Sequence, residues 1–170
     1  DRLSVNYEVE NCDSKTMLFS VGSHPAIDLP LENTTLSDYY VEFEQEEYLH
    51  RYELIGGLVK KQSKPYLNDE KIIKLTEHIF DDDALIFTNI KSKSINVKND
   101  ITDRNIKVNL GAPDIGIWAK PNADYVCIEP WYGYDDPVDS NNILGEKPAI
   151  QSLKSSKIFR TGYSIEAIKI

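Results

Sequence analysis

Apolar and polar residues alternate along much of this chain with a period of two. In residues 3–10 the apolar side chains fall on the odd positions and the polar ones on the even positions, which places one face of an extended strand on a core. Because many short, half-buried strands are typical of antiparallel sandwiches and barrels, the pattern predicts an all-β, predominantly antiparallel fold. The same alternation recurs in residues 17–21, 39–44, 94–98, 106–110 and 163–167.

Two other segments, residues 84–87 and 125–128, are continuous apolar runs and predict central strands that are buried on both faces. A helical turn competes with a strand only in residues 68–76, where acidic residues near the start could cap a helix. Residues 133–150 are rich in Gly, Pro, Asp and Asn and predict a long surface loop. No linker divides the chain, so residues 1–170 are expected to form a single domain or a portion of one.

The charge balance narrows the range of partners. Lys and Arg number 19 against 28 Asp and Glu, which gives a net charge of −9. Surfaces that bind nucleic acid or anionic membranes are held mainly by basic residues, so neither partner is expected. No apolar stretch approaches the roughly 18 residues of a membrane helix, and residues 1–30 lack the layout of a signal peptide. We therefore expect a soluble, cytoplasmic protein.

The two cysteines, Cys12 and Cys127, lie far apart in the sequence and form no Cys-x-x-Cys motif. This spacing indicates neither a disulfide framework nor a zinc site, and we expect reduced, half-buried thiols. Motifs for dinucleotides, phosphate loops, zinc proteases and hydrolase nucleophile elbows are also absent from the sequence. The chain begins at Asp1 without an initiator Met, which is consistent with a fragment of a longer protein.

The first candidate for chemistry is His24. An alternating strand breaks at Gly22, and Pro25 holds the backbone of the preceding histidine extended. A histidine fixed in this way suits proton transfer, because its ordinary pKa near 6.5 makes both protonation states accessible. The alternative is a structural, hydrogen-bonded histidine. His50 and His78 stand in polar surroundings and are expected at the surface.

The second candidate is Glu129, which follows an apolar run and precedes Pro130. Apolar surroundings destabilise the charged form of a carboxylate and raise its pKa into the range useful for an acid or a base. Trp131 and Tyr132 stand beside it, and aromatic rings next to carboxylates are suited to stacking on the apolar face of a sugar. Alternatively, Glu129 ends a strand at the surface and the aromatic residues belong to the core.

Two further segments have a weaker signal. Trp118 and Lys120 stand at a strand end, where a core tryptophan and a solvated lysine are the simpler interpretation. The run of three aspartates at 81–83 precedes a buried strand and is typical of a solvated turn. It is too short to supply the ordered ligand set of a calcium loop.

Four segments stand in an order that is shared with a known family: Val21-Gly22-Ser23-His24-Pro25-Ala26, residues 80–87, Gly116-Ile117-Trp118-Ala119-Lys120-Pro121 and residues 127–133. Together they resemble the aldose 1-epimerase (galactose mutarotase) family, and most closely its LacX-like branch; the later Gly145-Glu146-Lys147 also fits. The resemblance implies a galactose mutarotase-like β-sandwich of the supersandwich type, with a sugar site on one sheet. It implies an isomerase that interconverts the α and β anomers of a hexose or a hexose phosphate without a cofactor or a metal.

The resemblance also implies roles for single residues. It makes His24 the general acid and Glu129 the general base. Asp83 matches an aspartate that hydrogen-bonds sugar hydroxyls, although a shift of one or two positions would give this role to Asp81.

Family members are considerably longer on the N-terminal side, and their early sugar-binding arginine and asparagine have no counterpart before His24. Ile27 stands where an aromatic residue is common. The resemblance therefore implies the C-terminal part of a longer protein, with an incomplete sheet. An unpaired sheet edge would invite a missing N-terminal segment or a second copy.

Two rival functions remain open. One is a non-catalytic carbohydrate-binding module, and the other is a glycosidase in which Glu129 and Asp83 or Asp81 lie roughly 5–9.5 Å apart. His24 and Glu129 each stand where an apolar strand stops before a proline, so both should project from one end or face of the sheet and share one cavity. Trp118 or Trp131 should border that cavity, and the opposite charges of the acid and the base should lower the pKa of the glutamate and raise that of the histidine.

Overall fold

The computed structural model describes residues 1–30, 33–102 and 104–169. Strands dominate these residues, with two single 3-10 turns, η1 (Leu36–Asp38) and η2 (Leu144–Glu146). None of the helical segments in the described part is long and apolar enough to cross a membrane. The strands are β1 (Arg2–Glu10), β2 (Met17–Phe19), β3 (Val21–Gly22), β4 (Ala26–Asp28), β5 (Tyr39–Ile55), β6 (Leu58–Lys74), β7 (Leu85–Phe87), β8 (Ser94–Asn99), β9 (Arg104–Asn109), β10 (Asp114–Trp118), β11 (Tyr125–Tyr132), β12 (Gln151–Leu153) and β13 (Ile158–Lys169).

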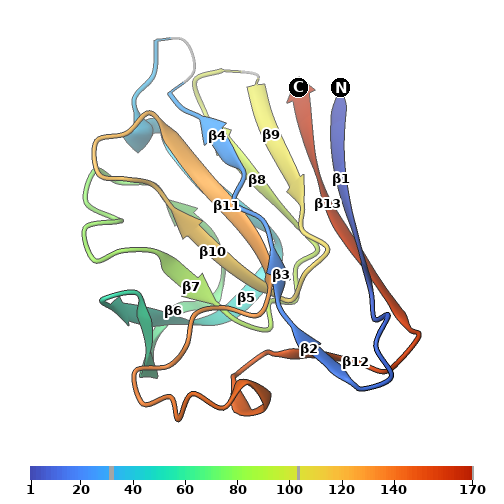
Figure 1. Cartoon of the computed structure of the whole chain (residues 1–170). Coiled ribbons are helices and arrows are strands. Elements are labelled where there is room, and N and C mark those ends of the chain that lie inside the picture. Colours follow the sequence, from blue (N-terminus) through green and yellow to red (C-terminus); the bar gives the residue numbers. More distant parts are fainter. Residues whose placement is uncertain (31–32, 103, 170) are drawn as a thin grey trace.

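One large antiparallel sheet forms most of the structure (Figure 1). Its strand order is β1-β13-β9-β8-β5-β7-β10-β11-β3, with β4 also paired to β11 and β6 paired to β5. β2 and β12 form a separate two-stranded sheet. In Figure 1 the strands β1 and β13 run side by side and carry both chain ends to the same side of the molecule. The predicted all-β, antiparallel fold is confirmed.

The large sheet curls so that one of its faces encloses the main core. Alternate residues of the central strands supply this core, because successive side chains of a strand point to opposite faces of the sheet. The opposite face of β7, β10 and β11 carries a smaller apolar cluster around Ile86 and Val59, together with the candidate site. The core residues of the central strands are Val41, Phe43, Leu85, Phe87, Ile95, Val97, Val108, Ile115, Ile117, Val126 and Ile128.

Residues 68–76, where a helical turn competed with a strand, contain no helix. Most of these residues complete β6, which pairs with β5 in a long hairpin. Leu67 and Ile73 turn into the core, and the pairing with β5 satisfies the backbone that a helix would have bonded internally. Asp69 has a φ of 62° and lies at a shift in the register, so the acidic run marks a β-bulge and not a helix cap.

Other differences concern the lengths of the elements. The strand predicted for residues 17–21 breaks at Ser20 into β2 and β3, and β11 extends four residues beyond the predicted apolar run. The strands β4, β10 and β12 were not predicted, because their sequences show no clear alternation of apolar and polar residues. Residues 133–150 form the predicted loop, with η2 and an isolated bridge between Val59 and Pro137.

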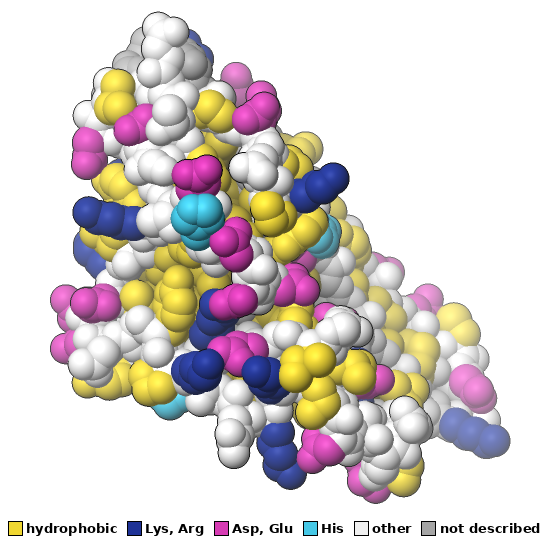
Figure 2. Space-filling model, turned by 90° about the vertical axis from the view of Figure 1, so that its left-hand side faces the viewer, with side chains coloured by type: hydrophobic (Ala, Val, Ile, Leu, Met, Phe, Trp, Pro, Cys, Tyr) yellow, Lys and Arg dark blue, Asp and Glu magenta, His cyan; other side chains and the backbone are white. Residues whose placement is uncertain are grey.

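The exposure of charged residues, cysteines and histidines can be compared with the sequence analysis. On the face shown in Figure 2, acidic, basic and apolar side chains are interspersed. The two cysteines are free, but they are not both half-buried: Cys12 is exposed and Cys127 is buried. His50 and His78 are exposed, as predicted.

Candidate active site

The candidate site lies where β11 pairs with the two short strands β3 and β4. Both strands follow one register along β11, on either side of the gap between them. The same register places His24, which lies in the gap, directly opposite Glu129. Directly opposed side chains of antiparallel strands lie close together on the same face. The pairs that fix the register are Val21 with Tyr132, Gly22 with Trp131, Ala26 with Cys127 and Ile27 with Val126.

Two prolines explain the gap between β3 and β4. Ser23 donates its N–H to the Pro130 carbonyl at 3.1 Å, and Ile128 donates its N–H to the Pro25 carbonyl at 3.2 Å. Proline has no N–H, so the return bond of each of these pairs is missing. The pair of His24 and Glu129 lies between them at a non-hydrogen-bonded position, where opposed side chains approach most closely.

The side chains of the two residues meet. His24 Nε2 lies 3.1 Å from Glu129 Oε1, and the ring packs edge-to-face against Trp118 with centroids 5.8 Å apart. The His24 side chain is 58% exposed and that of Glu129 only 5%. Glu129 therefore does not end a strand at the surface, since it lies inside β11, and the histidine is the accessible member of the pair.

Burial governs the ionisation of Glu129. It raises the pKa of this carboxyl to about 7, and the negative charge of Asp135 acts in the same direction. The lowering of this pKa that was expected from His24 is therefore wrong, because the loss of solvent around the carboxylate disfavours its charged form. Glu129 consequently changes its charge close to neutral pH, as expected for a carboxyl in apolar surroundings.

Trp131 lies across the neighbouring strands. A Cβ atom built on Gly22 of β3 would lie 2.6 Å from Trp131 Cδ1, and one on Gly116 of β10 would lie 2.5 Å from Cη2. Gly116 is also the partner of Glu129 on β10. Any side chain at either glycine would displace the indole, so the two glycines allow the ring to lie against the sheet beside the carboxylate.

A cavity of about 560 Å³ opens over these residues. This volume is in the range of about 300–1,000 Å³ that is usual for small-molecule sites. Asp81, the alternative to Asp83, lies on a neighbouring cavity and its carboxylate contacts His78 Nδ1 at 3.0 Å. The five predicted site residues all line the larger cavity: His24, Asp83, Trp118, Glu129 and Trp131.

The loop at residues 133–150 supplies lining residues that were not predicted as site residues. Lys147 is largely buried, lines the cavity and holds its Nζ 2.7 Å from Asp136 Oδ1. Tyr134 and Asp135 also line the cavity. The sequence marks this segment as a polar loop in which Gly145-Glu146-Lys147 fits the family, but neither feature gives Lys147 a place in the cavity.

The chain matches the aldose 1-epimerase family over residues 1–150 and belongs to that family. It is 26% identical to the LacX protein of Lactococcus lactis subsp. lactis, over 96% of this chain and 57% of that protein. The match to this family and its LacX-like relatives confirms the resemblance drawn from the motifs.

Solved structures show the same fold. A galactose mutarotase related enzyme from Lactobacillus acidophilus superposes with a TM-score of 0.90 at 30% identity, over 99% of this chain and 58% of that one. A galactose mutarotase-like protein from Lactobacillus casei has a TM-score of 0.82 at 23% identity, over 97% of this chain and 58% of that one. The chain therefore spans less than two thirds of the length of these relatives.

Proposed function

We propose that this chain carries the acid/base centre of a mutarotase that interconverts the α and β anomers of a hexose or a hexose phosphate. The observation that carries the proposal is the contact of 3.1 Å between His24 Nε2 and Glu129 Oε1 in a cavity lined by two tryptophans. Membership of the aldose 1-epimerase family supports an isomerase of this kind.

The pair supplies the two proton transfers that the reaction needs. Ionised Glu129 removes the proton of the C1 hydroxyl while protonated His24 delivers one to the ring oxygen, which opens the ring to the aldehyde. Rotation about the C1–C2 bond exposes the other face of the aldehyde, and the reverse transfers close the ring to the other anomer. Each positioned group contributes typically about 10²–10⁴-fold to the rate.

The other lining residues suit a sugar. The indoles of Trp118 and Trp131 offer apolar faces to a pyranose ring, and the Asp83 carboxylate accepts hydrogen bonds from hydroxyl groups. Neither a cofactor nor a metal is needed for the proton transfers.

The pH dependence follows from the charge states. A base with a pKa of about 7 loses activity as the pH falls below 7, because the proton then occupies the carboxylate. The reaction also needs a protonated acid, so the rate should fall again at higher pH and follow a bell-shaped curve.

Polarimetry on freshly dissolved α-glucose, α-galactose and hexose 6-phosphates tests the proposal. We expect the full-length protein to accelerate mutarotation of at least one of these sugars, and His24→Asn to reduce the rate at least about 100-fold. His78→Asn is the matched control, because His78 is exposed and lines no part of this cavity. Hexose binding without any acceleration would instead favour the carbohydrate-binding module.

A further inference from the structure

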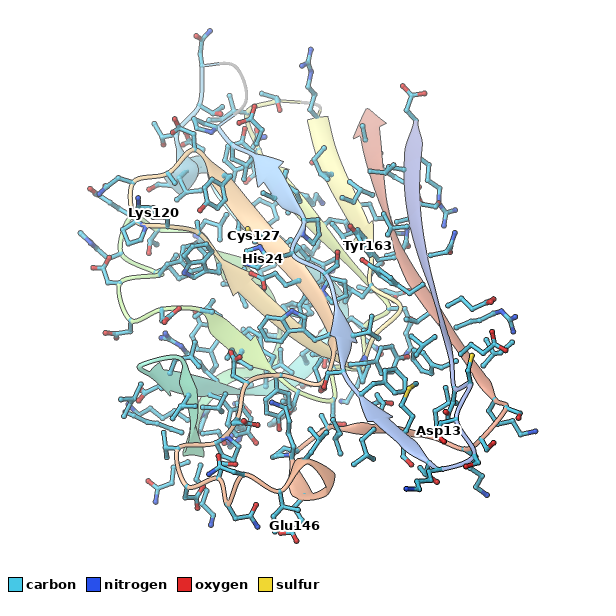
Figure 3. All side chains as sticks on the ribbon, viewed as in Figure 1. Asp13, His24, Lys120, Cys127, Glu146 and Tyr163 are labelled. Carbon is cyan, nitrogen blue, oxygen red and sulfur yellow. The ribbon has the colours of Figure 1, made fainter. Side chains whose placement is uncertain are left out.

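Cys127 lies beside the proposed acid/base pair and takes no part in its chemistry. One ligand atom each from His24, Cys127 and Glu129 lies within 4.8 Å of the other two. Cys127 and Glu129 are two positions apart on β11 and so project from the same face of the sheet, while His24 approaches from the gap in the neighbouring strand. Figure 3 shows His24 and Cys127 next to each other at β11.

The donor set matches one class of cation. An imidazole nitrogen, a thiolate sulfur and a carboxylate oxygen together favour borderline divalent metals such as zinc. A tetrahedral zinc ion bound at its usual distances holds such atoms about 3.3–3.6 Å from one another. The contact between His24 and Glu129 is already 3.1 Å, and the sulfur lies within 4.8 Å of the other two ligand atoms, so closing the set requires each of these separations to shrink by at most about 1.2 Å.

Two of the three ligands are held in place by the sheet and the third can move, which favours binding of a cation. Cys127 and Glu129 are buried in a strand that is paired on both sides, so their positions are fixed by the sheet. His24 is largely exposed and can adjust its ring toward a cation. The cavity leaves space for water as a fourth ligand, as in zinc sites with three protein ligands.

We propose that His24, Cys127 and Glu129 form a binding site for a zinc-like divalent cation, and that the bound cation blocks the acid/base pair. Binding replaces the thiol proton of Cys127, which is released to solvent, and uses the lone pairs that His24 and Glu129 need for proton transfer. The cation site stands on the geometry of the three ligands. The blocking of turnover rests on the function proposed above.

Cobalt(II) spectroscopy on the metal-free, full-length protein tests the site without any sugar. We expect visible bands of a tetrahedral Co²⁺ complex, a thiolate-to-cobalt charge-transfer band, and displacement of both by Zn²⁺. Cys127→Ser and Cys127→Ala should each remove the charge-transfer band and weaken zinc binding at least about tenfold, a loss that is usual even for outer-shell partners. Circular dichroism shows whether each variant is folded.

Cys12→Ser is the matched control, because Cys12 is exposed and distant from the three ligands in the fold. It should leave the spectrum and the zinc affinity unchanged. Absence of the cobalt bands in the unaltered protein, or their survival in both folded Cys127 variants, would overturn the site.

Mutarotation measured with and without Zn²⁺ tests the blocking. Zinc should inhibit the unaltered protein reversibly, with activity restored by a chelator, and the residual activity of Cys127→Ser should be at least about tenfold less sensitive. Cobalt bands without inhibition would overturn the blocking and leave the cation site. A metal-free protein without mutarotase activity would overturn the proposed function, while the spectra would still decide the site.

Discussion

Two regions of the same sheet differ in how regularly their strands pair. In the outer ladder, formed by β1 and β13, the pairing runs without a break from Arg2 opposite Glu166 to Glu10 opposite Ile158. In the site region, formed by β3, β4, β10 and β11, two prolines remove backbone bonds and two glycines leave space for an indole. The irregular region carries the cavity, and the register shared by β3 and β4 places His24 opposite Glu129 there.

The exposure of the two regions differs in parallel. Charged side chains of the outer ladder lie in solvent, and β1 has no strand on its outer side within the described residues. In β11 the residues from Val126 to Pro130 are buried. The same substitution should therefore have large effects in the site region and small effects in the outer ladder.

The largest contrast is expected between Glu129→Gln and Glu8→Gln. Glutamine keeps the shape of the side chain but cannot accept the C1 proton, so Glu129→Gln should reduce mutarotation about 10²–10⁴-fold. Glu8 lies exposed on β1, and its replacement should leave the rate unchanged. Initial rates by polarimetry check both, and equal rates for the two variants would remove Glu129 from the mechanism.

The pH dependence of stability gives the second contrast. The pKa of Glu129 is about 7 in the folded protein against an ordinary value of 4.5, so the folded state holds a proton that the unfolded state releases. Stability should therefore fall as the pH rises from about 4.5 to 7. At about 1.4 kcal/mol per pH unit this corresponds to at most about 3.5 kcal/mol.

Urea unfolding at pH 4.5 and pH 8 measures this effect. Glu129→Gln lacks the titrating group, so it should gain stability relative to the unaltered protein on going to pH 8. Glu8→Gln should follow the unaltered protein at both values. Parallel curves for all three proteins would show that Glu129 ionises normally.

Packing around Trp131 gives the third contrast. Gly116→Ala places a Cβ atom against the indole and should cost about 1–3 kcal/mol of the free energy of unfolding, because a filled site has no space for a further methyl group. Hexose affinity should fall as the ring tilts. Ser4→Ala on the exposed outer ladder should change the stability by less than about 0.5 kcal/mol. Denaturant unfolding measures the loss of stability, and a hexose titration followed by tryptophan fluorescence measures the loss of affinity.

The regular part of this fold could be predicted from the sequence, because alternation alone reports which face of a strand is buried. Residues 3–10 and 94–98 lie in strands as expected, and of residues 106–110 all but Leu110 do. The sequence left a helical turn and a strand open at residues 68–76, because acidic residues near the start of the segment are also typical of a helix cap. The pairing with β5 decides the conformation there, and no local pattern contains it.

The convergence of His24 and Glu129 was predicted, but its physical cause in the structure is a different one. His24 and Glu129 were expected to converge because each precedes a proline at a strand end, but Glu129 lies inside a strand. The prolines act instead by removing backbone bonds across one shared register. Cys127 lies near His24 and Glu129 because of that register, and Lys147 reaches the cavity because the loop at 133–150 returns to it. Residue types alone reveal neither the register nor the path of the loop.

The smallest expected effect belongs to an ion pair of the outer ladder. Arg160 Nε lies 2.8 Å from Glu8 Oε2, and the two side chains are 66% and 55% exposed. Water screens such a pair, and ordering two long side chains offsets most of the attraction, so its coupling free energy should lie between about 0 and 1 kcal/mol. A double-mutant cycle of Glu8→Ala and Arg160→Ala by urea unfolding measures the coupling, which should shrink further in 1 M salt. A coupling above about 2 kcal/mol would mean that the outer ladder is shielded from solvent, for instance by a further strand on the free edge of β1, and the contrast between the two regions would then need to be revised.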